Sequence, residues 1–168
     1  MDETKVSDPE QALRETYEIA YSESVKSLES QVDQIGQARS RATTLLTGAT
    51  VATAFLAGIA SDQMVKSPTS FKWGLAIYSV LTLFCVLVLA PIWKFAFEVQ
   101  ARNVIGWAED PDNPDSPGVI LRTLAWHKQG HWAENRKRLN RMYMLLFIAF
   151  VLLPAELACW VWPLIRNL

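Results

Sequence analysis

Long runs of apolar residues interrupt an otherwise polar chain of 168 residues. Ala42 to Ser61 and Trp73 to Trp93 hold no charged residue, although a charged residue stands at each edge of both runs. A helix needs about 20 predominantly apolar residues to cross the hydrocarbon core of a bilayer. The pattern therefore predicts transmembrane helices over residues 42–61 and 73–93.

A third apolar run, Met142 to Ile165, contains Glu156 and Pro154, so its assignment depends on magnitudes. Its Leu, Ile, Phe and Val residues favour insertion by about 5 kcal/mol, whereas one acid near the centre opposes it by about 3 kcal/mol. We therefore predict a third transmembrane helix over residues 142–165.

The polar segment before the first run is predicted to be a cytoplasmic amphipathic helix over residues 9–41, with its start at Ser7-Asp8-Pro9. Tyr21, Val25, Leu28, Val32 and Ile35 follow one another at alternating spacings of three and four, as in a coiled-coil seam. Packing within the chain and self-association account for this seam equally well.

Residues 94–141 are predicted to form a cytoplasmic helical hairpin. The second span is expected to continue as a helix past Lys94 toward Trp107, up to an acidic, proline-rich loop at residues 109–118. A new helix is expected from Ser116-Pro117, with the face Leu121 to Met142 leading into the third span. The fold class is then all-α, residues 1–168 being one membrane unit with long helical stalks, in a homo-oligomer.

The distribution of positive charge predicts the orientation. Of the 16 Lys and Arg residues, only Lys66, Lys72 and Arg166 fall on the side of the second loop and the C-terminus. Positive residues concentrate on the cytoplasmic side, so we expect a cytoplasmic N-terminus and an external C-terminus. The acidic start of the chain predicts no signal peptide.

Basic residues gather just before the third span. Arg136, Lys137, Arg138 and Arg141 are expected to contact anionic lipid headgroups, each with about 1 kcal/mol of attraction. The net charge of -1 argues against a nucleic-acid partner. The two cysteines lie inside apolar runs, which predicts neither a disulfide framework nor a thiolate zinc site.

Glu156 is the first candidate for chemistry, because an ionisable group inside a span is costly unless it faces protein or water. It could be a cation or proton site, or line an oligomeric pore. It could instead be a neutral acid that bonds to a neighbouring helix and fixes the packing, which is the favoured interpretation.

The first span carries a stripe of small and hydroxyl-bearing residues that could meet Glu156 or a second subunit. Its members are Thr43, Thr47, Thr50, Ala54, Ala57 and Ser61, and Gly48 with Ala52 adds a pair four residues apart. Small residues let helices approach closely. A packing interface is favoured over a pore wall.

His127, His131 and Glu134 share one face of the predicted stalk, a spacing at which two histidines can hold a metal. With no further His or Cys to complete a site, a polar helix face is the favoured interpretation, and we predict no cofactor. Phosphate loops, nucleophile elbows and metalloprotease motifs are missing from the sequence, so we do not expect an enzyme.

The layout as a whole resembles a group of small bacterial membrane proteins. A long helix enters the membrane through Gln37 to Leu46, and the basic segment Asn135 to Tyr143 precedes a Trp-rich last span. This is similar to the SLATT and Pycsar-type transmembrane effectors. The resemblance implies helices that assemble and breach the inner membrane on a cytoplasmic signal, although a ligand-sensing domain is not recognisable here and no site residue carries over.

These features lead to two functional hypotheses. The first is an oligomeric, channel-like or membrane-perturbing effector with Glu156 and the threonine stripe facing inward. The second is a structural or scaffold subunit whose cytoplasmic helices recruit a protein partner through the seams at Tyr21 to Ile35 and Leu121 to Met142. Both place the chain in the lipid bilayer.

Overall fold

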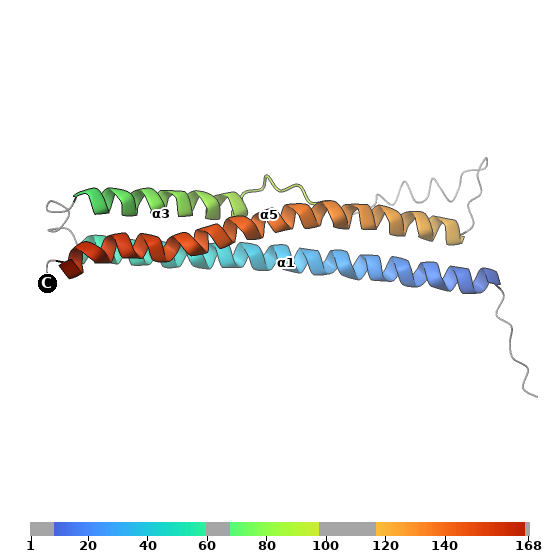
Figure 1. The fold of residues 1–168 in the computed structure, drawn as a ribbon. Coiled ribbons are helices and arrows are strands. Elements are labelled where there is room, and N and C mark those ends of the chain that lie inside the picture. Colours follow the sequence, from blue (N-terminus) through green and yellow to red (C-terminus); the bar gives the residue numbers. More distant parts are fainter. Residues whose placement is uncertain (1–8, 60–67, 98–116, 167–168) are drawn as a thin grey trace, which may run out of the picture. The chain divides into compact units, whose positions relative to one another are not determined.

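The computed structural model describes residues 9–59, 68–97 and 117–166, and the regular structure there is entirely α-helical (Figure 1). The helices are α1 (Pro9–Ile59), α3 (Pro68–Leu89) and α5 (Pro117–Arg166). All three are long and apolar enough to cross a membrane. The predicted all-helical class with three long apolar helices is therefore confirmed.

The chain divides into two compact units. Unit 1 comprises residues 1–33 and 95–137, and unit 2 comprises residues 34–94 and 138–168. The boundary between the units falls after Asp33 in α1 and after Lys137 in α5. Both helices therefore contribute residues to both units.

The core of unit 2 follows a spacing of three and four residues on every helix, as in coiled coils. Small residues occupy the buried face of α1, where they allow close approach of the other helices. The buried positions are Ile35, Ala38, Ala42 and Ala49 on α1, Phe71, Gly74, Leu81, Cys85 and Val88 on α3, and Leu139, Met142, Leu146, Ala149, Glu156, Trp160 and Pro163 on α5.

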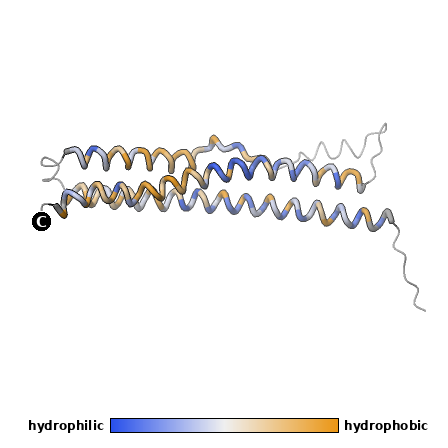
Figure 2. Tube along the Cα trace, viewed as in Figure 1, coloured by the Kyte–Doolittle hydropathy of each residue, from blue (hydrophilic) through white to orange (hydrophobic). Residues whose placement is uncertain are grey.

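The outer surface of unit 2 carries large apolar side chains on all three helices. Phe55 on α1, Leu83 on α3 and Phe147 on α5 are 67%, 54% and 67% exposed. Figure 2 shows apolar residues along α3 and along the C-terminal part of α5. Such an outside is costly in water and favourable in lipid, so the composition of this surface suggests a membrane location.

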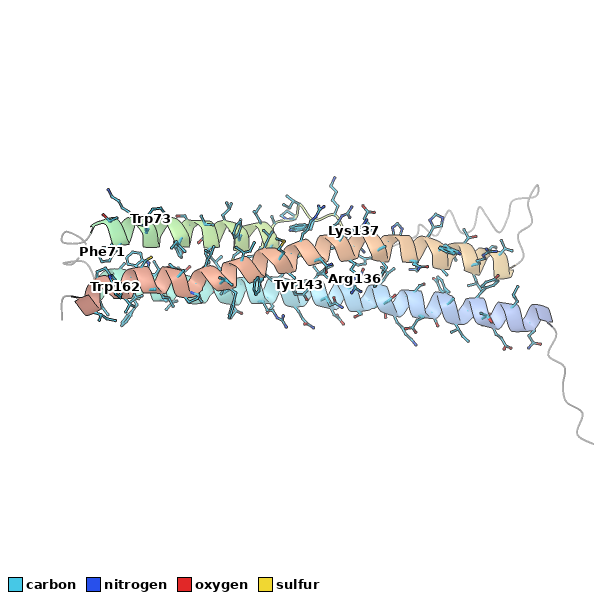
Figure 3. All side chains as sticks on the ribbon, in the orientation of Figure 1. Phe71, Trp73, Arg136, Lys137, Tyr143 and Trp162 are labelled. Atoms are coloured by element: carbon cyan, nitrogen blue, oxygen red, sulfur yellow. The ribbon has the colours of Figure 1, made fainter. Side chains whose placement is uncertain are left out.

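Exposed tryptophans mark one end of unit 2. Trp73 near the start of α3 and Trp162 near the end of α5 are 64% and 65% exposed and lie at the same end, close to Phe71 (Figure 3). Tryptophan is enriched where a membrane meets water, since its ring is apolar and its N–H is polar.

Unit 1 is a pairing of the first part of α1 with the first part of α5. Leu28 and Leu124 are buried there, and the Gln31 amide donates a hydrogen bond to the carbonyl of Trp132 at 3.0 Å. The ammonium of Lys128 lies 5.8 Å from the ring centre of Tyr21. These contacts join the two stalks within the chain.

The seam of α1 differs from the predicted one at a single position. Leu28 and Ile35 are buried as expected, but Val32 is 49% exposed and its place is taken by Gln31. Hydrophobicity alone predicts that Val32, and not Gln31, is buried in the seam. The hydrogen bond to Trp132 lets a glutamine occupy the buried position instead.

Helix α3 ends earlier than the sequence pattern indicated. Its last helical residue is Leu89, and residues 91–97 do not form a helix, so the expected continuation past Lys94 is wrong over this stretch. Pro91 is the reason, because it lacks an N–H and disfavours helical backbone at Ala90. Residues 98–116, including most of the acidic loop, lie outside the described residues.

Candidate functional site

The candidate site is a set of polar side chains inside the apolar helices of unit 2. Glu156 is fully buried, because the row Ala149, Glu156 and Pro163 recurs every seven residues along the inward face of α5. The hydroxyl of Thr53 on α1 donates a hydrogen bond to its Oε1 atom. One oxygen of the buried acid is therefore paired across two helices.

The second carboxyl oxygen of Glu156 has a different environment. Glu156 Oε2 and Trp160 Nε1, one turn further along α5, are both buried without a hydrogen-bond partner among the described residues. Since an unpaired buried polar group is expensive, these two atoms, an acceptor and a donor one turn apart, are a costly feature of the core of unit 2.

Apolar clusters lie on both sides of Glu156 along α5. On one side Trp160 meets Phe71 edge-to-face, with ring centres 5.3 Å apart. On the other side Ala149 packs with Leu81 and Cys85. Glu156 therefore lies between two apolar clusters of the same three-helix core.

A second polar contact lies on α1 and α3. The Thr50 hydroxyl lies 2.8 Å from the carbonyl of Leu46 and 2.9 Å from the hydroxyl of Tyr78. Because a hydroxyl has one proton, Thr50 donates to Leu46 and accepts from Tyr78 in the arrangement that satisfies all three groups. This contact links α1 to α3, as Thr53 and Glu156 link α1 to α5.

Gly74 of α3 leaves the space that the indole ring of Trp160 occupies. A Cβ atom on Gly74 would stand 2.9 Å from Trp160 Nε1 and 3.1 Å from its Cε2, so only glycine lets the indole ring lie against α3 here. The sequence analysis did not single out Gly74. Its place three residues after Phe71, on the buried face of α3, is the available signal.

The predicted threonine stripe does not face Glu156. Thr43, Thr47, Thr50, Gly48 and Ala54 are exposed. Ala52 and Ala57 are half-buried, and Ser61 lies outside the described residues. The partner of Glu156 is Thr53, which the sequence analysis missed although it follows the buried Ala49 by one turn. The exposed members Thr43, Thr47, Gly48 and Ala54 therefore lie on an outer surface of α1.

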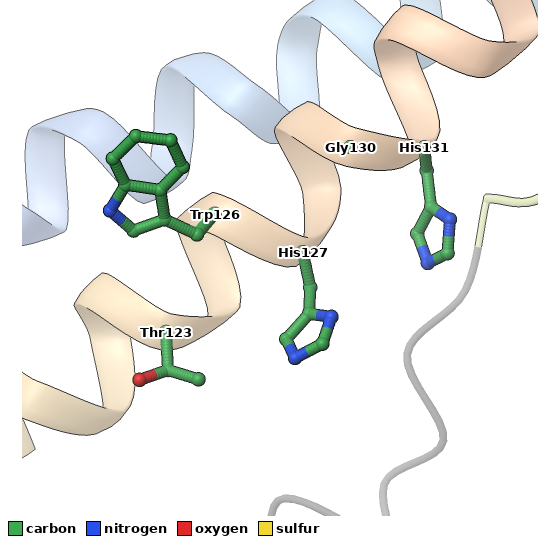
Figure 4. Close-up of a pocket in the computed structure, with 5 residues that line it drawn as sticks. All are labelled: Thr123, Trp126, His127, Gly130 and His131. Carbon is green, nitrogen blue, oxygen red and sulfur yellow. The ribbon is translucent and has the colours of Figure 1, made fainter.

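The two histidines of α5 line a shallow groove of about 470 Å³ together with Thr123, Trp126 and Gly130. Figure 4 shows the rings of His127 and His131 on one side of the helix, as their spacing predicts. Glu134 is exposed. Within residues 9–59, 68–97 and 117–166, no three His, Cys, Asp or Glu side chains come together as a metal site would require.

The basic residues before the third apolar run differ in their contacts and in their exposure. Arg136 places its guanidinium 4.9 Å from the ring centre of Trp132. Lys137 and Arg141 are exposed, and Arg138 is half-buried. Arg136 and Lys137 are labelled on α5 in Figure 3.

No protein-family model, curated protein sequence or solved structure matches the chain. The fold and its buried polar layer define an all-helical protein with three helices of membrane-spanning length and composition.

Proposed function

We propose that this chain is an integral membrane protein that self-associates and acts as a channel-like or membrane-perturbing effector in the bacterial inner membrane. Its three helices cross the bilayer, with the N-terminus in the cytoplasm and the C-terminus outside. The apolar outer surface of unit 2 and the exposed Trp73 and Trp162 at one end support the crossing. The excess of Lys and Arg on the other side of the spans supports the orientation.

The exposed polar stripe of α1 is the observation that carries self-association. Thr43 and Thr47 lie on the outside of a helix whose buried face is made of alanines, whereas Thr50 bonds to Tyr78 of α3 within the chain. The three-helix core is filled by its own side chains, so a conducting path needs several copies of the chain. Small residues such as Gly48 allow close approach between copies, and the threonine hydroxyls can contact water.

The buried position of Glu156 assigns it a structural part in this proposal. Its hydrogen bond from Thr53 lies within one chain, as expected for a polar group that fixes helix packing. The path between copies is therefore lined by the threonine stripe and not by Glu156. The layout that resembles the SLATT and Pycsar-type effectors supports the same overall activity.

The test combines native mass spectrometry in nanodiscs with ion flux from liposomes. We expect an assembly of four or more chains and measurable flux. Gly48→Leu places a bulky side chain on the exposed stripe and should reduce both by about tenfold. Ala76→Leu, the same kind of enlargement on the exposed face of α3, is the matched control and should reduce neither.

Two results would contradict the proposal in different ways. A monomer or simple dimer without flux would exclude a channel made of this chain alone. If Glu156→Gln abolished flux in a correctly assembled particle, the acid and not the threonine stripe would line the path.

A second function, a scaffold that recruits a cytoplasmic protein, is favoured by apolar residues exposed in unit 1. Leu13, Ile19 and Trp126 are 57%, 68% and 64% exposed. Large apolar side chains exposed on polar helices are common at protein interfaces. Flux from liposomes that hold this protein alone would favour the effector. Absence of flux, with a cellular partner lost in Ile19→Glu and Trp126→Glu but retained in Gly48→Leu, would favour the scaffold.

A further inference from the structure

We propose that a groove between α1 and α5 of unit 2 binds an anionic phospholipid, with its phosphate at Arg41 and one acyl chain along the apolar floor. The proposal rests on the membrane location proposed above, since it takes the lipid from the surrounding bilayer.

The groove has the shape and the lining that an acyl chain requires. Its volume is about 660 Å³, and its apolar wall is formed by Leu45 of α1 with Leu146, Phe147 and Phe150 of α5. Phe147 and Phe150 are 67% and 65% exposed, so their rings stand at the edges of the groove while Leu146, 8% exposed, forms the floor.

The polar end of the groove is built from the same two helices. Arg41 lies where the apolar run of α1 begins, beside Thr44 and Tyr143. Thr44 donates its hydroxyl to the carbonyl of Ser40 at 3.0 Å, and Tyr143 donates its own to the carbonyl of Gln34 at 3.3 Å. With these hydroxyl protons engaged, Arg41 is the charged donor among the residues that line this end.

The charge around the groove favours an anionic ligand. Arg39 and Arg141 lie within a turn of the lining residues on the same two helices, whereas the buried Glu156 is the single acidic residue in the described part of unit 2. Nε of Arg39 is buried and has no hydrogen-bond partner among the described residues. A phosphate beside Arg41 supplies acceptors to an end of the unit that lacks them, and guanidinium binds phosphate with two parallel hydrogen bonds.

A lipid fits this combination better than a second copy of the chain. A helix from another copy would have to place an acid or a carbonyl against Arg41 and at the same time fill a groove bordered by two phenylalanine rings. A phospholipid brings a phosphate and an acyl chain already joined at the level where the apolar segment meets its polar flank.

The experiment is native mass spectrometry of the full chain released from nanodiscs of equal parts phosphatidylglycerol and phosphatidylcholine. We expect phosphatidylglycerol to remain bound in preference to phosphatidylcholine. Arg41→Gln should lower the phosphatidylglycerol-bound fraction about tenfold, because it removes a charge-assisted contact. Phe147→Ala, which removes one wall, should lower it several-fold.

Two control variants match these changes elsewhere in unit 2. Lys72→Gln removes one exposed positive charge at the start of α3, and Phe55→Ala removes a phenylalanine that is as exposed as Phe147. Neither should change lipid retention. An equal loss in Lys72→Gln and Arg41→Gln would mean that net charge alone attracts the lipid, and would overturn the groove.

Other outcomes separate this inference from the proposed membrane location. A wild-type chain that fails to float with vesicles of the same composition would overturn both. A chain that floats but retains no phosphatidylglycerol would overturn the lipid site alone. So would an assembly whose copies separate in Phe147→Ala, because the groove would then hold a second copy.

Discussion

The side chain of Asn135 pairs with both backbone groups of Ala96. The amide oxygen of Asn135 accepts from the Ala96 N–H at 3.1 Å, and its amide nitrogen donates to the Ala96 carbonyl at 2.8 Å. Asn135 is 1% exposed on α5, and Ala96 belongs to the segment after α3 that forms no helix. The side chain therefore replaces the hydrogen bonds that secondary structure would otherwise give this backbone.

Asn135→Ala should destabilise unit 1 by about 2 kcal/mol, because both backbone groups of Ala96 lose their partner. Hydrogen exchange of the Ala96 amide should accelerate, and unfolding in detergent should begin at a lower denaturant concentration. Asn140→Ala, an exposed asparagine of the same helix, is the control and should change neither. Unchanged exchange at Ala96 would show that water serves this backbone equally well.

Thr53→Val should weaken the packing of α1 against α5, because Glu156 loses the hydroxyl that bonds to it. Hydrogen bonds between membrane helices average well below 2 kcal/mol, so we expect a loss of about 1 kcal/mol. Glu156→Gln keeps an acceptor for Thr53 and should cost less. The measurement is unfolding in mixed micelles, with the exposed Thr47→Val as control.

A double-mutant cycle isolates this contact from general effects of each substitution. The cost of Thr53→Val should largely disappear when Glu156 is already leucine. If the two substitutions were additive instead, the hydrogen bond would contribute nothing measurable to stability.

The sequence was sufficient for the elements but not for the face that each helix buries. Uncharged runs mark all three helices, because length and hydrophobicity determine which segments can be apolar helices, and Pro9 and Pro117 mark the starts of α1 and α5. Helix α1, however, has two faces made of small residues, one with Ala42 and Ala49 and one with Thr43 and Thr47. Which of them is buried depends on the shapes of α3 and α5, and these are not visible in the sequence of α1.

The end of α3 is a case in which the sequence held a signal that apolar periodicity outweighed. Phe95 and Val99 continue the helical spacing, yet Pro91 removes a hydrogen bond and ends the helix at Leu89. Thr53 is different in kind. Only the position of Glu156 on a neighbouring helix distinguishes it from the other threonines of α1.

Gly74→Ala should disturb the end of unit 2 where Trp160 packs. The added Cβ would stand 2.9 Å from Trp160 Nε1, and the indole is already confined by Phe71. We expect a loss of about 1 to 3 kcal/mol, as for other overpacked cores, and a change in tryptophan fluorescence. Gly58→Ala is the control, since a Cβ there meets nothing within 4 Å. A native-like Gly74→Ala would mean that α3 moves away from α5 at little cost.

Gln31→Leu should stabilise the chain, although it removes a hydrogen bond. The Gln31 amide nitrogen donates to the Trp132 carbonyl, which lies inside α5 and already accepts a helical hydrogen bond, while its amide oxygen is buried without a partner among the described residues. Leucine removes that unpaired oxygen and fills the seam between Leu28 and Ile35, for a gain of about 1 kcal/mol in the free energy of unfolding. Thermal unfolding in detergent measures it, and Val32→Leu, at a half-exposed neighbour, should change stability by less. Destabilisation by Gln31→Leu would show that the bond to Trp132 outweighs the buried oxygen, and that this glutamine fixes the pairing of the two stalks.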